Sequence, residues 1–334
     1  MFSASPRAGQ TLEVAPGVHW LRTSLPFRLN AVNLWLLEDG DSWTMVDCGY
    51  PLPEVQAQIE AAWSHLLGGR PIRRLIVTHH HPDHVGNCRW ICDRWDILPS
   101  MSQGEYKKAQ ALAGEGQNQM QLRTAFWQRH GLSAEIGEQV IHTWRRGVTL
   151  LQPLKECRLL ADGHRLQIGD YEWQIIVARG HSPEQLLLYS SRQKLLISGD
   201  QVLNPITPNV SVPYDAPESD PLGLFLQSNL HIAENCDEAA VLPSHKQPFR
   251  GLHRRILDIE EHHHARLEKV ETQLRKAPAT AASILPALFG HPDKLTAHEI
   301  GFAIGETIAH LNCLVATGRA IRNSSSAKIV FTST

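Results

Sequence analysis

The sequence predicts an α/β protein, arranged as a four-layer αββα sandwich in which two sheets lie between outer layers of helices. Three observations predict this class. Segments with strand-like alternation occur at 18–46 and return after residue 157. Amphipathic stretches at 53–67 and 84–95 separate strands, as helices on the outer face of a sheet do. Several apolar runs end directly in turns that carry His or Asp, so reactive groups are expected where strands end.

The strongest signal is a His-x-His-x-Asp-His motif at residues 79–84, which directly follows the apolar run 75–77. His79 and His81 alternate along an extended segment, so both rings are expected to point to one side. Asp83 and His84 follow as the chain turns and are aimed at a second position nearby, which indicates two metals. Neutral imidazole and carboxylate groups suit zinc and similar divalent ions.

This motif resembles the metal-binding signature of the metallo-β-lactamase superfamily, and three further motifs of that superfamily follow in order over roughly residues 14–250. They are Gly-His-Ser-Pro at 180–183, an apolar strand ending in Asp200, and a turn ending in His245, with Ser244 where Gly is commoner. The resemblance implies a first metal held by His79, His81 and His181, a second held by Asp83, His84 and His245, and Asp200 bridging the two. Zinc is favoured for both ions, and iron and manganese are alternatives.

Such a site predicts hydrolysis without a Ser or Cys nucleophile. Two metals bridged by Asp200 leave room for a shared water, and paired cations lower its pKa so that a metal-bridging hydroxide becomes the nucleophile. Asp83 is placed to orient or shuttle the proton to the leaving group, so Asp83 and Asp200 are the candidate catalytic carboxylates.

Three further residues are candidates for supporting roles. Asp47 lies in an Asp-x-Gly turn that, by resemblance, sits under the metal site and orients ligands, although it also suits a turn former. Asn209 and Tyr214, in the Pro- and Asn-rich loop 201–217, are available to a substrate, although such loops also merely connect. One departure concerns Gln185, because many relatives carry His at that point.

We expect a catalytic domain at 1–251 and a C-terminal helical module at 252–334. The segment at about 103–152 is expected to form two or three helices, broken at Gly114, Gly116, Gly131 and Gly147, that cover the active site as a lid. The order helix, helix, helix, hairpin in the module resembles a winged-helix-like tail on one branch of the superfamily. Its apolar and acidic segment 299–306 is unsuited to reading DNA, so we expect a cap or a homodimer contact.

Composition limits the partners. With 42% hydrophobic and 20% charged residues the chain can bury a large core, and a net charge of −2 gives no field for nucleic acid or anionic membrane. The six scattered cysteines are typical of reduced thiols in a cytosolic protein, and residues 1–6 show no signal-peptide pattern. No apolar run approaches the roughly 20 residues of a membrane span. A cytoplasmic enzyme with a small-molecule substrate is therefore expected.

The substrate class is inferred from the ligand set. The bridging carboxylate and the Asp-His pair resemble the thioesterase, lactonase and phosphodiesterase branches more than true β-lactamases, and an apolar, Trp-bearing lid suits an acyl thioester or lactone. A phosphodiesterase or endoribonuclease is the first alternative, but it would need basic residues beyond the pairs 107–108 and 145–146. A regulatory binding protein that keeps the fold is the other alternative, and the complete ligand set argues against it.

Overall fold

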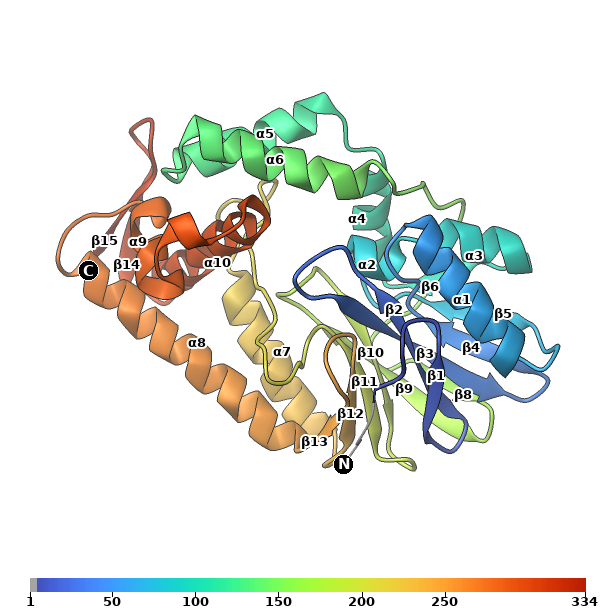
Figure 1. Cartoon of the computed structure of the whole chain (residues 1–334). Helices are drawn as coiled ribbons and strands as arrows, with labels where there is room; N and C mark the ends of the chain where they lie inside the picture. Colours follow the sequence, from blue (N-terminus) through green and yellow to red (C-terminus); the bar gives the residue numbers. More distant parts are fainter. Residues whose placement is uncertain (1–4) are drawn as a thin grey trace. The chain divides into compact units, whose positions relative to one another are not determined.

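The computed structural model describes residues 5–334. Residues 1–4, which belong to the stretch expected to carry no signal peptide, lie outside the described residues. The chain divides into two compact units (Figure 1). Unit 1 consists of Met1–Gly114, Val148–Pro208 and Ser228–Ile256, and unit 2 consists of Glu115–Gly147, Asn209–Gln227 and Leu257–Thr334. The chain therefore passes between the units several times. The single domain boundary expected at residue 251 stays a prediction.

Two sheets form the framework of unit 1. The first has seven strands in the order β1 to β7, antiparallel up to β4 and parallel from there on. Its strands are β1 (Thr11–Ala15), β2 (Val18–Ser24), β3 (Ala31–Asp39), β4 (Ser42–Val46), β5 (Ile72–Ile76), β6 (Pro99–Met101) and β7 (Arg158–Leu159). The second has the order β13-β12-β11-β10-β9-β8. Its strands are β8 (Arg165–Ile168), β9 (Tyr171–Ala178), β10 (Gln185–Ser190), β11 (Leu195–Gly199), β12 (Ala240–Pro243) and β13 (Phe249–Arg250).

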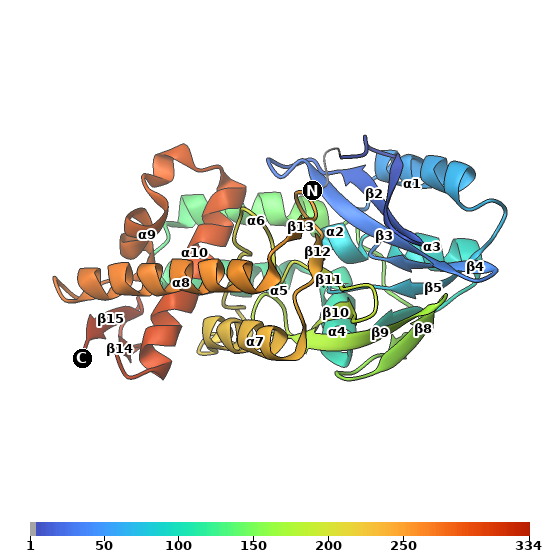
Figure 2. The same cartoon turned by 90° about the horizontal axis from the view of Figure 1, so that it is seen from below.

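The inner faces of the two sheets share one apolar core. Trp20 and Trp35 of the first sheet stack with ring centroids 6.2 Å apart, and both belong to the same buried cluster as Trp173 of the second sheet. On the outer side of the first sheet lie α1 (Pro53–Leu66) and α3 (Cys88–Trp95) (Figures 1 and 2). On the second sheet, Ser228 of α7 (Pro221–Asn235) accepts a hydrogen bond from the backbone of Arg179. The expected α/β sandwich is confirmed.

Two local predictions near the metal motif are wrong. The helix expected at 84–95 is split into α2 (Pro82–Val85) and α3, because Asn87 turns its side chain to donate to the backbone oxygens of Cys48 and Tyr50. The strand expected at 96–98 begins only at β6, because Asp96 takes a left-handed conformation, with φ of 50°, that ends α3.

The segment after β6 forms three helices, as predicted. They are α4 (Gln103–Ala113), which belongs to unit 1, and α5 (Gln117–Arg129) and α6 (Ala134–Val148), which belong to unit 2 apart from the last residue of α6. Gly114, Gly116 and Gly131 lie between these helices. Gly147 does not break the chain as expected, since α6 continues to Val148, and a glycine in a last helical turn costs only about 1 kcal/mol. That this segment covers the active site stays a prediction.

The C-terminal part has the predicted order of elements. It contains α8 (Leu252–Leu274), α9 (Ala281–Phe289), a short 3₁₀ turn (Pro292–Lys294), α10 (Ala297–Ala316) and a hairpin of β14 (Ala320–Asn323) and β15 (Val330–Ser333). A winged-helix arrangement of these elements stays a prediction. Among residues 5–334, no helix has both the length and the apolar character needed to cross a membrane.

Candidate metal centre

The seven predicted ligands lie in turns that follow buried strands. The loop after β5 carries His79 and His81 and leads into α2 with Asp83 and His84, while His181 lies between β9 and β10. Asp200 follows β11 directly, and His245 follows β12 by two residues. Because β11 and β12 are parallel neighbours, their carboxyl ends meet at the same edge of the second sheet.

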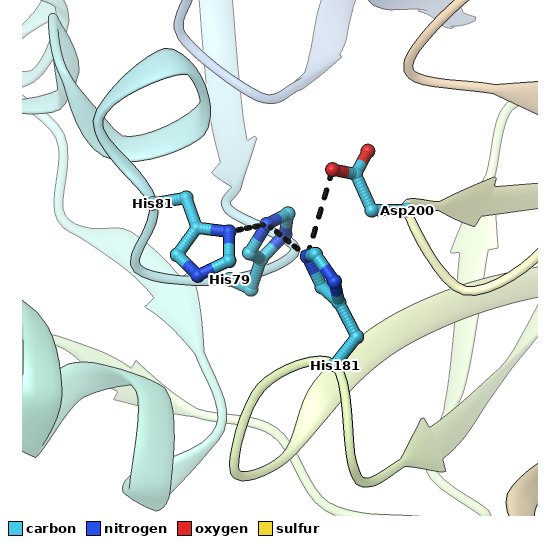
Figure 3. Close-up of side chains that lie close together, drawn as sticks. All are labelled: His79, His81, His181 and Asp200. Atoms are coloured by element: carbon cyan, nitrogen blue, oxygen red, sulfur yellow. Dashed lines mark hydrogen bonds and ion pairs between the residues drawn. The ribbon is translucent and has the colours of Figure 1, made fainter. Parts of the chain in front are cut away.

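Four of these residues converge into what we call the first cluster, namely His79, His81, His181 and Asp200 (Figure 3). Nε2 of His79 lies 3.0 Å from Nδ1 of His81 and 3.3 Å from Nε2 of His181. Nε2 of His181 lies 3.5 Å from Oδ2 of Asp200. Three ring nitrogens and one carboxylate oxygen thus point at one small volume.

The remaining three form the second cluster, namely Asp83, His84 and His245. Oδ2 of Asp83 lies 3.3 Å from Nε2 of His245 and 3.6 Å from Nε2 of His84. Asp200 reaches this cluster as well, because its Oδ2 lies 3.5 Å from Nε2 of His245 and its Oδ1 lies 3.6 Å from Nε2 of His84. The carboxylate of Asp200 therefore contacts histidines of both clusters.

Hydrogen bonds to Nδ1 orient three of the five histidine rings, those of His79, His84 and His245. Asp47 accepts from the backbone N–H of Thr78 at 2.7 Å, from the Thr78 hydroxyl at 2.9 Å and from Nδ1 of His84 at 2.8 Å. Since the Thr78 hydroxyl donates to Asp47, its oxygen accepts from Nδ1 of His79 at 3.0 Å. Nδ1 of His245 donates to the Ala31 carbonyl at 3.0 Å. Nε2 of each of these three histidines is therefore the ring nitrogen turned toward the other cluster residues.

The turns that carry Asp200 and His245 are held by amide side chains. Asn33 of β3 donates to the backbone oxygens of Pro243 and Lys246, on both sides of His245, at 2.8 and 2.9 Å. Gln185, at the point where many relatives carry His, accepts from the backbone N–H of Asp200 at 3.3 Å. The departure in sequence therefore supplies a support for the Asp200 turn.

The two clusters differ in the direction in which their surroundings shift the pKa of the histidines. Burial, together with the neighbouring histidines, holds the pKa of His79 and of His81 well below the usual range, so both rings are neutral. Burial also acts to lower the pKa of His84 and His245, but the negative charges of Asp83 and Asp200 outweigh it and raise the pKa of His245 to about 10. Positive charge is thus favoured at the second cluster. A bound cation would supply that charge to Asp83 and Asp200 in place of the protons on the two histidine rings.

The residues present fit a metal centre. Within the described part of the chain, Nε2 of His84 and Oδ1 of Asp200 are buried and have no hydrogen-bond partner. A buried polar atom without a partner costs about 1–3 kcal/mol, which coordination of a cation would remove. Imidazole and carboxylate donors suit zinc and similar divalent ions.

The two candidate substrate residues lie in unit 2. Asn209 donates to Glu306 at 3.0 Å and to the backbone oxygen of Phe302 at 3.3 Å. The ring of Tyr214 lies under the guanidinium of Arg123 at 4.6 Å from its centroid. Their role as substrate contacts stays a prediction.

Sequence reasoning missed Glu105, whose buried carboxylate contacts two of the ligand-bearing loops. The pattern Ser102-x-x-Glu105 is typical of a helix start, and Ser102 does cap α4 by accepting from the backbone N–H of Glu105. That pattern locates the helix but gives no sign that the Glu105 side chain turns inward.

This fold and these two clusters define a metal-binding αββα protein. Residues 28–248 match the Metallo-beta-lactamase superfamily, and residues 267–333 match the Metallo-beta-lactamase-like, C-terminal domain. The chain belongs to the metallo-β-lactamase superfamily of metal-dependent hydrolases, and its His and Asp clusters are able to bind metal ions.

Three relatives illustrate the likeness. A beta-lactamase domain protein from Burkholderia ambifaria, of solved structure, is 37% identical with a TM-score of 0.92, over 100% of this chain and 97% of that one. The probable metallo-hydrolase YqjP of Bacillus subtilis is 24% identical over 89% of this chain and 91% of its own. The acyl-coenzyme A thioesterase MBLAC2 of Homo sapiens is 25% identical over 56% of this chain and 63% of its own.

Proposed function

We propose that this chain is a dinuclear metal-dependent hydrolase that acts on acyl thioesters. The position of Asp200 carries the proposal, because its two oxygens lie 3.5 and 3.6 Å from histidines of both clusters. Two cations bound there would supply Lewis acidity and lower the pKa of water toward neutrality. Zinc is the favoured metal, with iron and manganese as alternatives.

The chain's own residues would divide the work as follows. The first cluster would hold one ion, the second cluster the other, and Asp200 would contact both. Asp83 has a side chain that is 22% exposed, against 9% for Asp200. The more open carboxylate is better placed to pass a proton to a leaving thiolate, whereas the buried one is better placed to hold metals.

The choice of a thioester as the substrate class is supported by the similarity of this chain to MBLAC2, which is an acyl-coenzyme A thioesterase. The apolar character of the predicted lid adds little support for this substrate, because Met120, Phe126 and Trp127 are at most 8% exposed. These side chains are therefore largely used in packing. Lactones remain the second substrate class to be tried.

Recognition of nucleic acid finds little support in the C-terminal module. A recognition helix needs an exposed face with polar and basic side chains. In α10 the consecutive residues 303–314 are buried. The phosphodiesterase alternative therefore serves as a comparison in the assay.

The test combines metal analysis with a substrate panel. Untagged protein would be assayed for metal content and for turnover of acyl-coenzyme A thioesters, a γ-lactone and bis-p-nitrophenyl phosphate. We expect about two metals per chain and thioester turnover that falls by about 100-fold or more in Asp200→Ala. His65→Ala, an exposed histidine on α1, is the matched control and should leave both unchanged.

The outcomes separate the alternatives. Metal-loaded protein that cleaves only the phosphodiester would replace the thioester by a phosphodiesterase function. Protein that takes up no divalent metal and turns over none of the substrates would contradict the hydrolase proposal as a whole.

A further inference from the structure

The carboxylate of Glu105 is fully buried, although it comes from the first turn of α4. One oxygen, Oε2, accepts from the backbone N–H of His80 at 2.9 Å and from its Nδ1 at 2.7 Å. The other, Oε1, accepts from the Ser182 hydroxyl at 2.6 Å and from the backbone N–H of Glu184 at 2.7 Å. Each oxygen thus binds a different loop.

The two loops are those that carry the histidines of the first cluster. His80 lies between His79 and His81, and Ser182 directly follows His181. One carboxylate therefore joins the backbone that positions all three ring nitrogens. The second cluster has other supports, because His84 is held by Asp47 and His245 by the Ala31 carbonyl.

Glu105 stays charged in this position. Burial acts to raise the pKa of its carboxyl group, but the electrostatic attraction of the His80 ring and the hydrogen bonds from His80, Ser182 and Glu184 outweigh burial and lower it. A buried carboxylate costs several kcal/mol unless its acceptor sites are filled. Packing alone would need only an apolar side chain at this position. The charged group is explained by the four hydrogen-bond donors that it binds.

The contact is reciprocal. The carboxylate of Glu184 accepts from the backbone N–H of Gly104, which precedes Glu105 in α4, at 2.7 Å. A Cβ at Gly104 would lie 2.8 Å from that same oxygen, so the approach of helix and loop is close. The His181 turn and the start of α4 are therefore fastened by two adjacent residues.

We propose that Glu105 is a positioning residue for the metal centre, which sets the spacing between the His79–His81 loop and the His181 turn and thereby holds the ion of the first cluster. This inference rests on the proposed two-metal centre. It concerns only one of the two ions, because the donors that Glu105 fastens belong to one cluster.

The test is the rate at which zinc leaves the fully loaded, full-length protein when a chromogenic chelator is added. In Glu105→Gln one oxygen becomes an NH₂ group, which must face either the backbone N–H of His80 or that of Glu184. One backbone donor then loses its acceptor whichever way the amide turns. We expect one of the two zinc ions to leave about 10- to 100-fold faster and the other to leave at the unaltered rate.

Two further variants keep the test decisive. Glu115→Gln is the matched control, because Glu115 is a buried carboxylate that binds Arg123 and Trp144, and it should leave both release rates unchanged. Ser182→Ala removes one of the four donors, and it serves if Glu105→Gln does not fold. There we expect a several-fold faster release, again of one ion only.

Two results would overturn the proposal. Release of both ions at the unaltered rates from folded Glu105→Gln or Ser182→Ala would show that the carboxylate does not affect metal binding by the first cluster. Equal acceleration of both ions would show general loosening of the fold. The assay needs no substrate. Protein that binds two zinc ions but cleaves no thioester would therefore contradict the proposed substrate without contradicting the role of Glu105.

Discussion

Oδ2 of Asp47 lies 2.8 Å from Nδ1 of His84, and both side chains are buried. Asp47 has a φ of 64°, a left-handed conformation that Asp and Asn adopt more readily than most residues. The strained turn after β4 thus aims a carboxylate at the ring of a predicted ligand and, through Thr78, at a second one.

Asp47→Asn is expected to weaken the metal centre without disturbing the backbone. Asn tolerates the same φ, but its NH₂ group must replace one acceptor that now serves Thr78 or His84. Loss of such a partner typically lowers metal affinity or activity about 10- to 100-fold. Elemental analysis after dialysis against dilute chelator should show less metal than in the unaltered protein. Equal retention of metal would refute this role for Asp47.

Asn33→Ala should loosen the turn that carries His245. The substitution leaves the backbone oxygens of Pro243 and Lys246 without their donor, and each lost partner costs about 1–3 kcal/mol where the oxygen is buried. We expect the free energy of unfolding in urea to fall by about 2 kcal/mol or more. Asn30→Ala, at an exposed position before β3, is the control that should change it little. A similar loss in both variants would be the contrary result.

Acid is expected to destabilise unit 2 through three buried histidines. Burial lowers the pKa of His130 and of His310 to about 4, and burial with neighbouring histidines lowers that of His263 to about 2. The unfolded chain binds these protons near pH 6.5 and the folded chain does not. The stability that these neutral histidines allow is therefore fully present above pH 6.5. The free energy of unfolding falls as the pH drops toward their pKa values in the folded state, by about 1.4 kcal/mol per pH unit for each histidine.

Glu306 acts in the opposite sense. Burial raises the pKa of its carboxyl group to about 7, against the attraction of Arg266 and the hydrogen bond from Asn209. Its contribution is present below the unfolded pKa, about 4.3, and is lost as the pH rises toward 7. Because three histidines oppose one carboxyl group, the net effect between pH 6.5 and 5 is a loss of stability on acidification.

Hydrogen exchange measured by mass spectrometry at pH 7 and 5, corrected for the intrinsic rates, should localise this effect to the peptides of α8, of α10 and of the end of α5, where His130 lies. His130→Phe places an apolar ring beside Phe126 and Phe331 and should flatten the acid slope by roughly one histidine. His142→Phe, at an exposed position of α6, should leave the slope as it is. An acid slope unaffected by His130→Phe would contradict this reading.

Removing only one partner of the ion pair between Arg266 and Glu306 should lower stability more than removing both partners. Nη1 of Arg266 lies 2.5 Å from Oε1 of Glu306, and the side chains are 16% and 7% exposed. Arg266→Met leaves a buried carboxylate without its cation, so we expect a loss of about 3 kcal/mol or more at pH 8. The double variant Arg266→Met with Glu306→Gln should recover much of it. Thermal unfolding of Arg266→Met, of Glu306→Gln and of the double variant measures the three losses of stability. Additive losses from the two single changes would refute the coupling.

The residues of the two clusters could be predicted from the sequence because they lie in four short motifs, each of which follows a strand, while their role as metal ligands stays a prediction. His79, His81, His181 and Asp200 are named by patterns within a few residues, and the fold needs only to bring the strand ends together. Apolar runs and apolar–polar alternation likewise placed strands within residues 18–46, before His79 and after residue 157, where the structure has them.

The rest depends on contacts between segments that are distant in the chain. Glu105 lies 25 residues from His80 and 77 from Ser182, so no local pattern joins them. Residues 115–147 pack in one unit with residues 257–334, although a β-sheet framework separates them in sequence. Small shifts, such as the later start of β6, follow from backbone turns like that of Asp96, which composition does not reveal.

The central claim, a pair of metals joined by Asp200, is tested most directly by a crystal structure of the zinc-loaded protein with anomalous data at the zinc edge. The account predicts two peaks, one within about 2.0–2.2 Å of the donor atoms of His79, His81 and His181, the other of those of Asp83, His84 and His245, with Asp200 bound to both. A single peak, or an Asp200 that contacts only one of two ions, would contradict it.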